Sequence, residues 1–296
     1  MTSTHIFVTL VKYTTFILYL TIGASIGADC CAIKKSVSSK DTEKLKIELL
    51  ADVPSVNANS TFQLGLHIRH FKELSTENGS NLQYHTYWKN PGIVGVPTNI
   101  KWQLPKGFTI SDAQWPYPEL TKMIDIPCYG YERDIIIIYT VTAPKNLTQK
   151  NITISGDASW MCCATKCHPG YSTLSLTLPV TEKVEARAHP VLFDQAYREL
   201  PKSEHSIKAT LLSSPNAPQI KVHLRSSKPF IPIHLFNSDG QTSPDQTHSL
   251  EHQPDNSWIY LAQRPEHSPK DKKEFPMVLQ TKSGYFTLSA KPEPNK

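Results

Sequence analysis

The chain has 296 residues, with 31 Lys and Arg against 26 Asp and Glu, which gives a formal net charge of +5. A hydrophobic fraction of 39% excludes a disordered polyelectrolyte, and the mild charge without a dense basic cluster argues against a nucleic-acid partner. Proline, at 23 residues, outnumbers glycine, at 12. This composition argues against a helical bundle and against a nucleotide-binding fold with a glycine-rich phosphate loop, and it favours short strands joined by proline-containing loops.

The first 28 residues have the pattern of a secretory signal peptide. A single lysine, Lys12, precedes an apolar run over residues 14–26, and small residues follow up to Ala28. The run is shorter than the ~20 apolar residues that a membrane-spanning helix needs, although an uncleaved anchor is the alternative interpretation. We therefore expect a signal peptide over residues 1–28 and an exported mature chain, periplasmic or in an equivalent compartment, and soluble there. Such compartments are oxidising, so disulfide bonds persist in them.

Alternating apolar and polar residues predict β-strands up to residue 180. The predicted strands cover residues 44–50, 61–70, 82–88, 134–142, 151–160 and 171–180, and turns rich in Asn, Pro, Gly and Ser separate them. Four consecutive isoleucines at residues 135–138 favour a strand buried on both faces over a solvated edge strand.

The pattern breaks over residues 182–200, which hold a candidate helix at 193–200, and then returns to strands. The second set of predicted strands covers residues 206–212, 219–225, 257–261, 277–281 and 285–290, with 237–256 interpreted as a long exposed loop and 291–296 as a frayed tail. We predict an all-β protein with two immunoglobulin-like β-sandwich domains in tandem after the signal peptide. The predicted boundaries are 29–182 for the first domain, 183–203 for the linker and 204–296 for the second domain.

Three of the six cysteines lie close together in the motif WMCCATKCHPG, at residues 160–170. Six cysteines in a chain of this length are too few for a disulfide-built scaffold, so the cluster needs a local explanation. On a helix, Cys163 and Cys167 would have Cβ atoms ~5–6 Å apart, whereas a disulfide needs about 3.8 Å. Bonding them requires a tight turn, for which Pro169 and Gly170 are the expected residues. A disulfide that closes so small a loop adds little stability, which favours redox exchange over stapling.

The neighbours of this cluster leave three interpretations open. Positive charge at Lys166 and His168 would lower the pKa of Cys167 and favour a reactive thiolate. A structural hairpin disulfide without turnover is the first alternative. A metal site is the second, with Cys162, Cys163, Cys167 and His168 binding Cu(I) rather than Zn(II), because the usual two-residue gap between zinc-binding cysteines is missing.

The other cysteines give weaker signals. Cys128 is either a buried apolar residue or a disulfide partner of Cys162. Cys30 and Cys31 follow the predicted cleavage site, and their partners cannot be assigned from sequence.

Five blocks occur in order over residues 42–182 and resemble one known family. They are HTYWKNPG at residues 85–92, WQLPKG at 102–107, WPYP at 115–118, YGYE at 129–132 and WMCCATKCHP at 160–169. Together they resemble the amino-terminal, periplasmic domain of the DsbD/ScsB family of thiol:disulfide interchange proteins. The second half resembles ScsB-type proteins more weakly, through AYRELP at residues 196–201 and FPMVLQTKSG at 275–284.

The resemblance implies roles for particular residues. Cys163 and Cys167 fall on the family's redox pair, and the more carboxy-terminal cysteine, Cys167, is the one implied to react first. Cys162 is an extra thiol where the family usually has none, so it becomes an auxiliary candidate, as does His168.

The YGYE block supplies further auxiliary candidates. In the family a short aromatic-bearing loop shields the redox pair, and this implies a flap that contains Tyr129, Tyr131 and Glu132. For His85, Tyr87 and Trp88 in the HTYW block, we favour the inward face of a strand over a lining of the redox site.

The resemblance also implies a function and partners. We expect a thiol:disulfide oxidoreductase of the protein-disulfide reductase type that uses no cofactor and serves processes such as cytochrome c biogenesis. Its electron donor would be a membrane-embedded thiol protein or a thioredoxin-like protein, and its clients thioredoxin-like or disulfide-isomerase proteins. Because the chain ends at Lys296 without a membrane-embedded domain, that donor is expected to be a separate protein. A non-catalytic β-sandwich adaptor and a Cu(I)-binding copper-tolerance protein are the alternative hypotheses.

Overall fold

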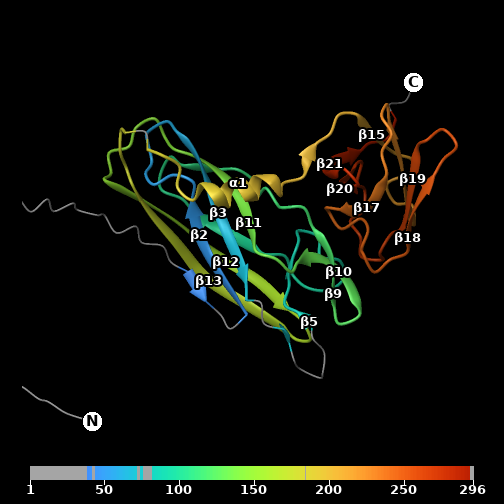
Figure 1. Cartoon of the computed structure of the whole chain (residues 1–296), viewed down its shortest axis with the longest axis horizontal. Coiled ribbons are helices and arrows are strands. Elements are labelled where there is room, and N and C mark those ends of the chain that lie inside the picture. The colour runs from blue at the N-terminus through green and yellow to red at the C-terminus, as the bar shows by residue number, and fades with distance from the viewer. Residues whose placement is uncertain (1–38, 42–43, 72–73, 76–81, 184, 294–296) are drawn as a thin grey trace, which may run out of the picture. The chain divides into compact units, whose positions relative to one another are not determined.

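The computed structural model describes residues 39–41, 44–71, 74–75, 82–183 and 185–293 (Figure 1). The predicted signal peptide, with Cys30 and Cys31, lies outside these residues. The described part of the chain consists mainly of antiparallel strands with one α-helix, which confirms the all-β prediction. No helix within it is long and apolar enough to cross a membrane.

The first half of the chain, residues 39–180, forms one large sheet and three smaller ones. The large sheet has the order β1-β2-β3-β11-β8, with bounds β1 Ser39–Asp41, β2 Leu45–Ala51, β3 Thr61–His70, β11 Ile135–Thr142 and β8 Thr109–Ile110. The second sheet, β13-β12-β7, contains β13 Cys167–Pro179, β12 Asn151–Cys163 and β7 Asn99–Gln103. The third, β6-β10-β9, contains β6 Thr86–Tyr87, β10 Ile126–Tyr131 and β9 Glu119–Met123, and a two-stranded ribbon pairs β4 Leu74–Ser75 with β5 Leu82–Gln83.

The alternation read from the sequence explains why these sheets form a sandwich. Every second residue of β12 is buried from Ile152 onward, and the same holds for the later part of β13. The buried faces of β2, β3, β11, β12 and β13 share one hydrophobic core, to which Leu49, Leu66, Ile137, Ile154 and Leu176 contribute fully buried side chains.

The isoleucine run is buried on both faces, as expected. Ile135 and Ile137 belong to the sandwich core, whereas Ile136 and Ile138 pack against α1, Pro190–Arg198. Figure 1 shows α1 beside β11. This helix begins three residues before the predicted position because Pro190 fits the first helical turn.

The second half of the chain, residues 202–293, forms two four-stranded sheets around its own core. One has the order β14-β21-β20-β17, with β14 Lys202–Ser203, β21 Gly284–Ala290, β20 Phe275–Thr281 and β17 Pro232–Asn237. The other has the order β15-β16-β19-β18, with β15 Ile207–Leu211, β16 Gln219–Ser226, β19 Trp258–Gln263 and β18 His248–His252. Side chains of β16 and β20 meet in this core, including Val222, Leu224, Met277 and Leu279.

Contacts also join the two halves. Phe236 of β17 belongs to the core of the first half, where its ring lies 6.4 Å from that of Trp88. Tyr117 and Tyr285 stack with ring centroids 4.0 Å apart. Residues 39–293 lie within one compact unit, so the domain and linker boundaries stay predictions.

The predicted exposed loop at residues 237–256 is wrong in its first part. Asn237, Gln241, Thr242 and Ser243 are buried, and β18 occupies residues 248–252. The side chain of Asn237 accounts for this, because its Oδ1 accepts hydrogen bonds from the backbone N–H groups of Gln241 and Thr242 at 2.7 and 3.3 Å. A polar stretch therefore folds into a buried turn by bonding its own backbone.

Removal of a core side chain should cost far more stability than removal of an exposed leucine. Leu176 is fully buried in the first core, so Leu176→Ala should lower the free energy of unfolding by about 3 kcal/mol. Leu120 is 54% exposed, and Leu120→Ala is the control, with an expected change below about 0.5 kcal/mol. Urea denaturation of the mature chain measures both, and equal losses would contradict this description of the core.

Candidate functional site

The candidate site lies at the end of the β12–β13 hairpin. These strands pair without interruption from Asn151↔Pro179 to Cys163↔Cys167, and a disulfide joins the last pair, with Cα atoms 4.2 Å apart. The turn consists of residues 164–166 and is closed by a hydrogen bond from Ala164 N–H to the Lys166 carbonyl at 3.1 Å. The tight turn expected between the cysteines is therefore present.

The residues assigned to that turn were wrong, because Pro169 and Gly170 lie within β13. Gly170 pairs directly with Trp160, whose ring packs across the glycine. A Cβ atom at residue 170 would lie 2.2 Å from the Trp160 ring, so only glycine fits there. The glycine serves aromatic packing on a strand and has no part in turning the chain.

Strand alternation separates the residues of the CC motif onto two faces. Cys162 pairs with His168, and Cys162 lies in the sandwich core, while the His168 ring lies 5.9 Å from that of Tyr84. Cys163 and Cys167 belong to a different cluster on the other face. The four proposed Cu(I) ligands are thus not brought together, and no group of three or more His, Cys, Asp or Glu suited to a metal occurs among the described residues.

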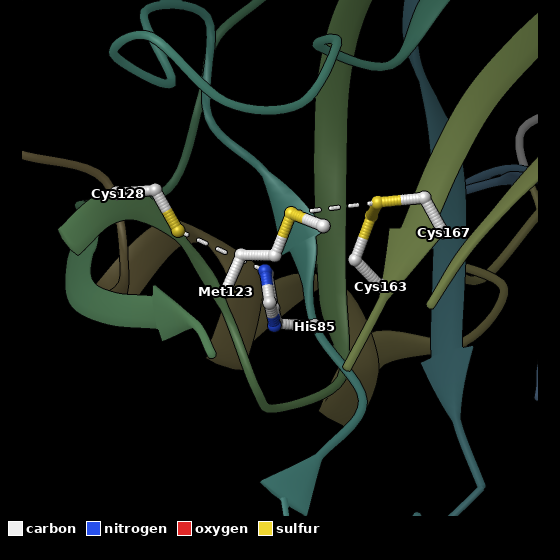
Figure 2. Close-up of a disulfide and its surroundings, with 5 residues drawn as sticks. All are labelled: His85, Met123, Cys128, Cys163 and Cys167. Atoms are coloured by element: carbon white, nitrogen blue, oxygen red, sulfur yellow. Dashed lines mark hydrogen bonds between the residues drawn. A yellow bond between two sulfur atoms is a disulfide. The ribbon is translucent and has the colours of Figure 1, made fainter. Parts of the chain in front are cut away.

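Residues of the HTYW block lie beneath the disulfide. His85 exchanges two backbone hydrogen bonds with Cys163, both 2.9 Å long. Nε2 of its ring lies 3.7 Å from Sγ of Cys128 (Figure 2). The ring also makes an edge-to-face contact with that of Tyr87. Tyr87, Cys128 and Cys163 are fully buried and form one small apolar cluster. His85 and Tyr87 are buried on an inward face, as preferred, and they also lie beside the disulfide. Trp88 lies in the sandwich core.

A second hairpin covers the disulfide from the side. Met123 ends β9, and its Sδ lies 3.6 Å from Sγ of Cys167 (Figure 2). A bonded cysteine has no thiol proton, so this is a packing contact between two polarisable sulfurs. Val94 and Met161 pack against the same cluster. The sequence analysis missed Met123 and Val94, although each lies between or beside the family-like blocks.

Tyr129 and Tyr131 of the YGYE block lie on β10 and Glu132 follows it, but all three side chains make their contacts elsewhere. Tyr129 packs against Phe236 and bonds His234 Nε2 through its hydroxyl at 3.1 Å. Tyr131 donates its hydroxyl to the Pro116 carbonyl, and Glu132 accepts a hydrogen bond from Thr121. In this hairpin the side chain that contacts the disulfide is Met123 rather than an aromatic residue.

Among the described residues, the two free cysteines are poor nucleophiles in the folded chain. Cys128 and Cys162 are unbonded and buried, so the interpretation of Cys128 as a buried apolar residue is confirmed and the alternative disulfide with Cys162 is absent. Burial raises the pKa of each thiol to about 12. Of the disulfide's two sulfur-bearing residues, Cys163 is fully buried and Cys167 is partly exposed. Cys167 therefore presents more accessible surface than Cys163.

Alkylation of the native chain should confirm this inertness. A thiol whose pKa rises from 9 to about 12 loses roughly a thousandfold in thiolate population at pH 8. Iodoacetamide should therefore modify Cys128 and Cys162 at least a hundredfold more slowly in the folded mature chain than in denaturant. Peptide mass mapping follows each residue separately, and rapid labelling of either cysteine in the folded chain would contradict the assigned burial.

The site should also make stability depend on pH through His85. Burial lowers the pKa of His85 to about 4, so between this value and about 6.5 the unfolded chain binds a proton that the folded chain excludes. The free energy of unfolding therefore falls as the pH drops through this window. For His85→Gln, the loss between pH 7 and pH 4.5 should be smaller than in the parent by about 2 kcal/mol. Urea denaturation at both pH values measures it, and equal losses in the two proteins would refute the prediction.

Comparison with known proteins identifies a family model that matches part of the chain. Residues 55–179 match the family model described as "Thiol:disulfide interchange protein DsbD, N-terminal". No curated protein sequence matches the chain. Among solved structures, the N-terminal periplasmic domain of ScsB from Proteus mirabilis has the same fold, with a TM-score of 0.61 and 14% identity over 87% of this chain and 97% of that one. A marsupial T cell receptor is matched at a TM-score of only 0.20 and 12% identity, over 86% of this chain and 100% of that one, which supports no conclusion.

The family match includes the strands that carry the disulfide and the segments that surround it. The strands of the hairpin, the HTYW block and the β9–β10 hairpin all lie within the matched residues. Residues 55–179 therefore match the DsbD amino-terminal domain model, and the ScsB domain shares the fold.

Proposed function

We propose that the protein is an exported thiol:disulfide interchange protein that carries electrons through the Cys163–Cys167 pair. The observation that carries this proposal is the unequal exposure of one disulfide, with Cys167 accessible and Cys163 enclosed. This arrangement gives an incoming thiolate one point of attack and keeps the leaving sulfur next to it. The family match supports the reaction class.

In the proposed reduction, a donor thiolate attacks Sγ of Cys167. The S–S bond breaks, its electron pair goes to Sγ of Cys163, and a mixed disulfide joins the donor to Cys167. The donor's second thiolate then attacks the donor sulfur of this bond and releases Cys167. The donor ends as a disulfide, and the protein ends as a dithiol after uptake of two protons.

Electron delivery reverses these roles. The Cys167 thiolate attacks a client disulfide, forms a mixed disulfide and releases one client thiolate. Cys163 then attacks Sγ of Cys167, restores the Cys163–Cys167 bond and releases the second client thiolate. Neither half-reaction uses a cofactor, and both leave the sulfurs within the same hairpin.

The surroundings of the pair suit a polypeptide partner. Ile93 and Val96, on either side of Val94, are 62% and 52% exposed, and Ile124, which follows Met123, is 50% exposed. Exposed apolar side chains beside a reactive group are typical of a protein-docking surface. We propose a thioredoxin-like or membrane-embedded thiol protein as donor and disulfide-bearing proteins as clients.

Replacement of Cys163 should trap the proposed intermediate. In Cys163→Ser, Cys167 keeps its accessible position but has no resolving neighbour, so a thioredoxin-like partner activated as a disulfide should remain bonded to it. Non-reducing electrophoresis and mass mapping should find the cross-link at Cys167 in most of the protein, and Cys167→Ser should form less than a tenth as much. Cys162→Ala is the control and should exchange like the parent, because its thiol is buried in the core.

The redox potential of the parent protein distinguishes a disulfide that takes part in exchange from a structural disulfide. Thiol trapping in defined glutathione or dithiothreitol buffers should place the potential of Cys163–Cys167 above about −300 mV, the upper limit for structural disulfides. A pair that lies well below this value and forms no cross-link in Cys163→Ser would favour the adaptor hypothesis.

A further inference from the structure

The turn at residues 237–246 presents two carbonyl groups to the first half of the chain. Its shape depends on Asn237, whose Oδ1 accepts from the backbone of Gln241 and Thr242, while its Nδ2 donates to Asp239 and to the Pro276 carbonyl at 2.9 and 3.0 Å. The carbonyl oxygens of Asn237 and Thr242 are thereby left for a partner outside the turn.

Asn90 of the first half is that partner. Its Nδ2 donates hydrogen bonds to the carbonyls of Asn237 and Thr242 at 2.8 and 3.2 Å, and its Oδ1 accepts from the backbone N–H of Gly92 at 3.3 Å. The side chain is 7% exposed. Loss of this amide would leave two buried carbonyls without a donor, which is costly in a site closed to water.

The backbone continues this contact beyond Asn90. Gly92 has a φ of +95°, and a Cβ atom there would lie 2.8 Å from Cδ of Pro244 and 3.0 Å from Oγ of Ser243. The chain is therefore pressed directly against the turn of the second half. On its other side, the Pro91 carbonyl accepts a hydrogen bond from Tyr129 N–H at 3.1 Å.

Two residues later the same segment reaches the apolar cluster to which Cys163 belongs. Val94 packs against the cluster of Tyr87, Cys128 and Cys163 that Cys167 also contacts. Gly95 lies over the ring of Tyr87, where a Cβ atom would come within 2.2 Å of Cζ. Residues 90–96, which we term the covering segment, thus touch the second half at one end and the disulfide cluster at the other.

We propose that the second half of the chain restrains the reactivity of the disulfide by anchoring the covering segment through Asn90. Asn90 is a positioning residue, since it acts on the disulfide only through Val94 and Gly95. Through this anchor the second half of the chain would influence the thiol:disulfide exchange proposed above. The biological purpose of the anchor rests on that proposed function. The anchor and its effect on the disulfide are measurable with a small dithiol, whatever partner the protein uses.

Asn90→Ala should release the covering segment and expose the disulfide. In the mature oxidised chain, the second-order rate of Cys163–Cys167 reduction by dithiothreitol should rise at least fivefold, as followed by acid quench, alkylation and mass spectrometry. Amide hydrogen exchange at residues 92–96 should accelerate in parallel. Gly92→Ala disturbs the same anchor from the backbone side and should shift both readouts in the same direction.

Tyr285→Leu is the matched control. It removes the stacking on Tyr117, another contact between the two halves, without touching the covering segment. Its reduction rate should stay within twofold of the parent even if its melting temperature falls. Equal acceleration in Tyr285→Leu and Asn90→Ala would overturn the proposal in favour of a general loosening between the halves.

Unchanged amide hydrogen exchange at residues 92–96 in Asn90→Ala would also overturn the proposed anchoring role of Asn90. This measurement does not require reduction of the disulfide. The proposed function fails by a different result. Suppose that dithiothreitol reduces the disulfide faster in Asn90→Ala, but that Cys163→Ser forms no cross-link with a thioredoxin-like partner. The anchoring role of Asn90 would then stand, and the proposed thiol:disulfide exchange would be refuted.

Discussion

The register of the β12–β13 hairpin is the constraint on which the site depends. Thirteen consecutive pairs place Cys163 directly opposite Cys167, and the same register places Cys162 opposite His168 on the other face. Because side chains alternate along a strand, a shift by one residue would exchange the two faces completely. The long hydrophobic alternation of both strands, buried against β2, β3 and β11, holds this register with many side chains rather than with the disulfide itself.

Much of this fold could be predicted from local pattern, and the failures have identifiable causes. The alternation at residues 151–160 and 171–180 predicted the hairpin strands, but the apolar period gave no reason to extend them to Cys163 and Cys167. Pro169 and Gly170 are usually turn residues, yet the ring of Trp160 requires the glycine on the strand. The polar stretch that contains Asn237 looked solvated, because sequence cannot show that the Asn237 side chain would accept from the backbone of Gln241 and donate to the Pro276 carbonyl in a buried turn.

The sequence indicated the cysteines of the candidate site, whose residue type is itself reactive. It did not indicate the apolar residues, which belong to the site only because of where the fold places them. Two cysteines at this spacing within family-like blocks were sufficient to indicate Cys163 and Cys167. Met123 and Val94 are ordinary apolar residues, and only the meeting of three separate chain segments places them against the pair. His85 could have been assigned to the site from one further signal, namely that it shares a strand face with Tyr87 at a spacing of two residues.

The division of Cys162 and Cys163 between two faces has a consequence for biogenesis. An extended, newly synthesised chain offers an oxidant three thiols within six residues, and nothing local distinguishes Cys162 from Cys163 at that moment. Only the completed hairpin conceals one sulfur in the core and presents the other to Cys167. Correct oxidation therefore has to follow strand pairing, and premature bonding of Cys162 would be an error that the protein's own folding must undo by reshuffling.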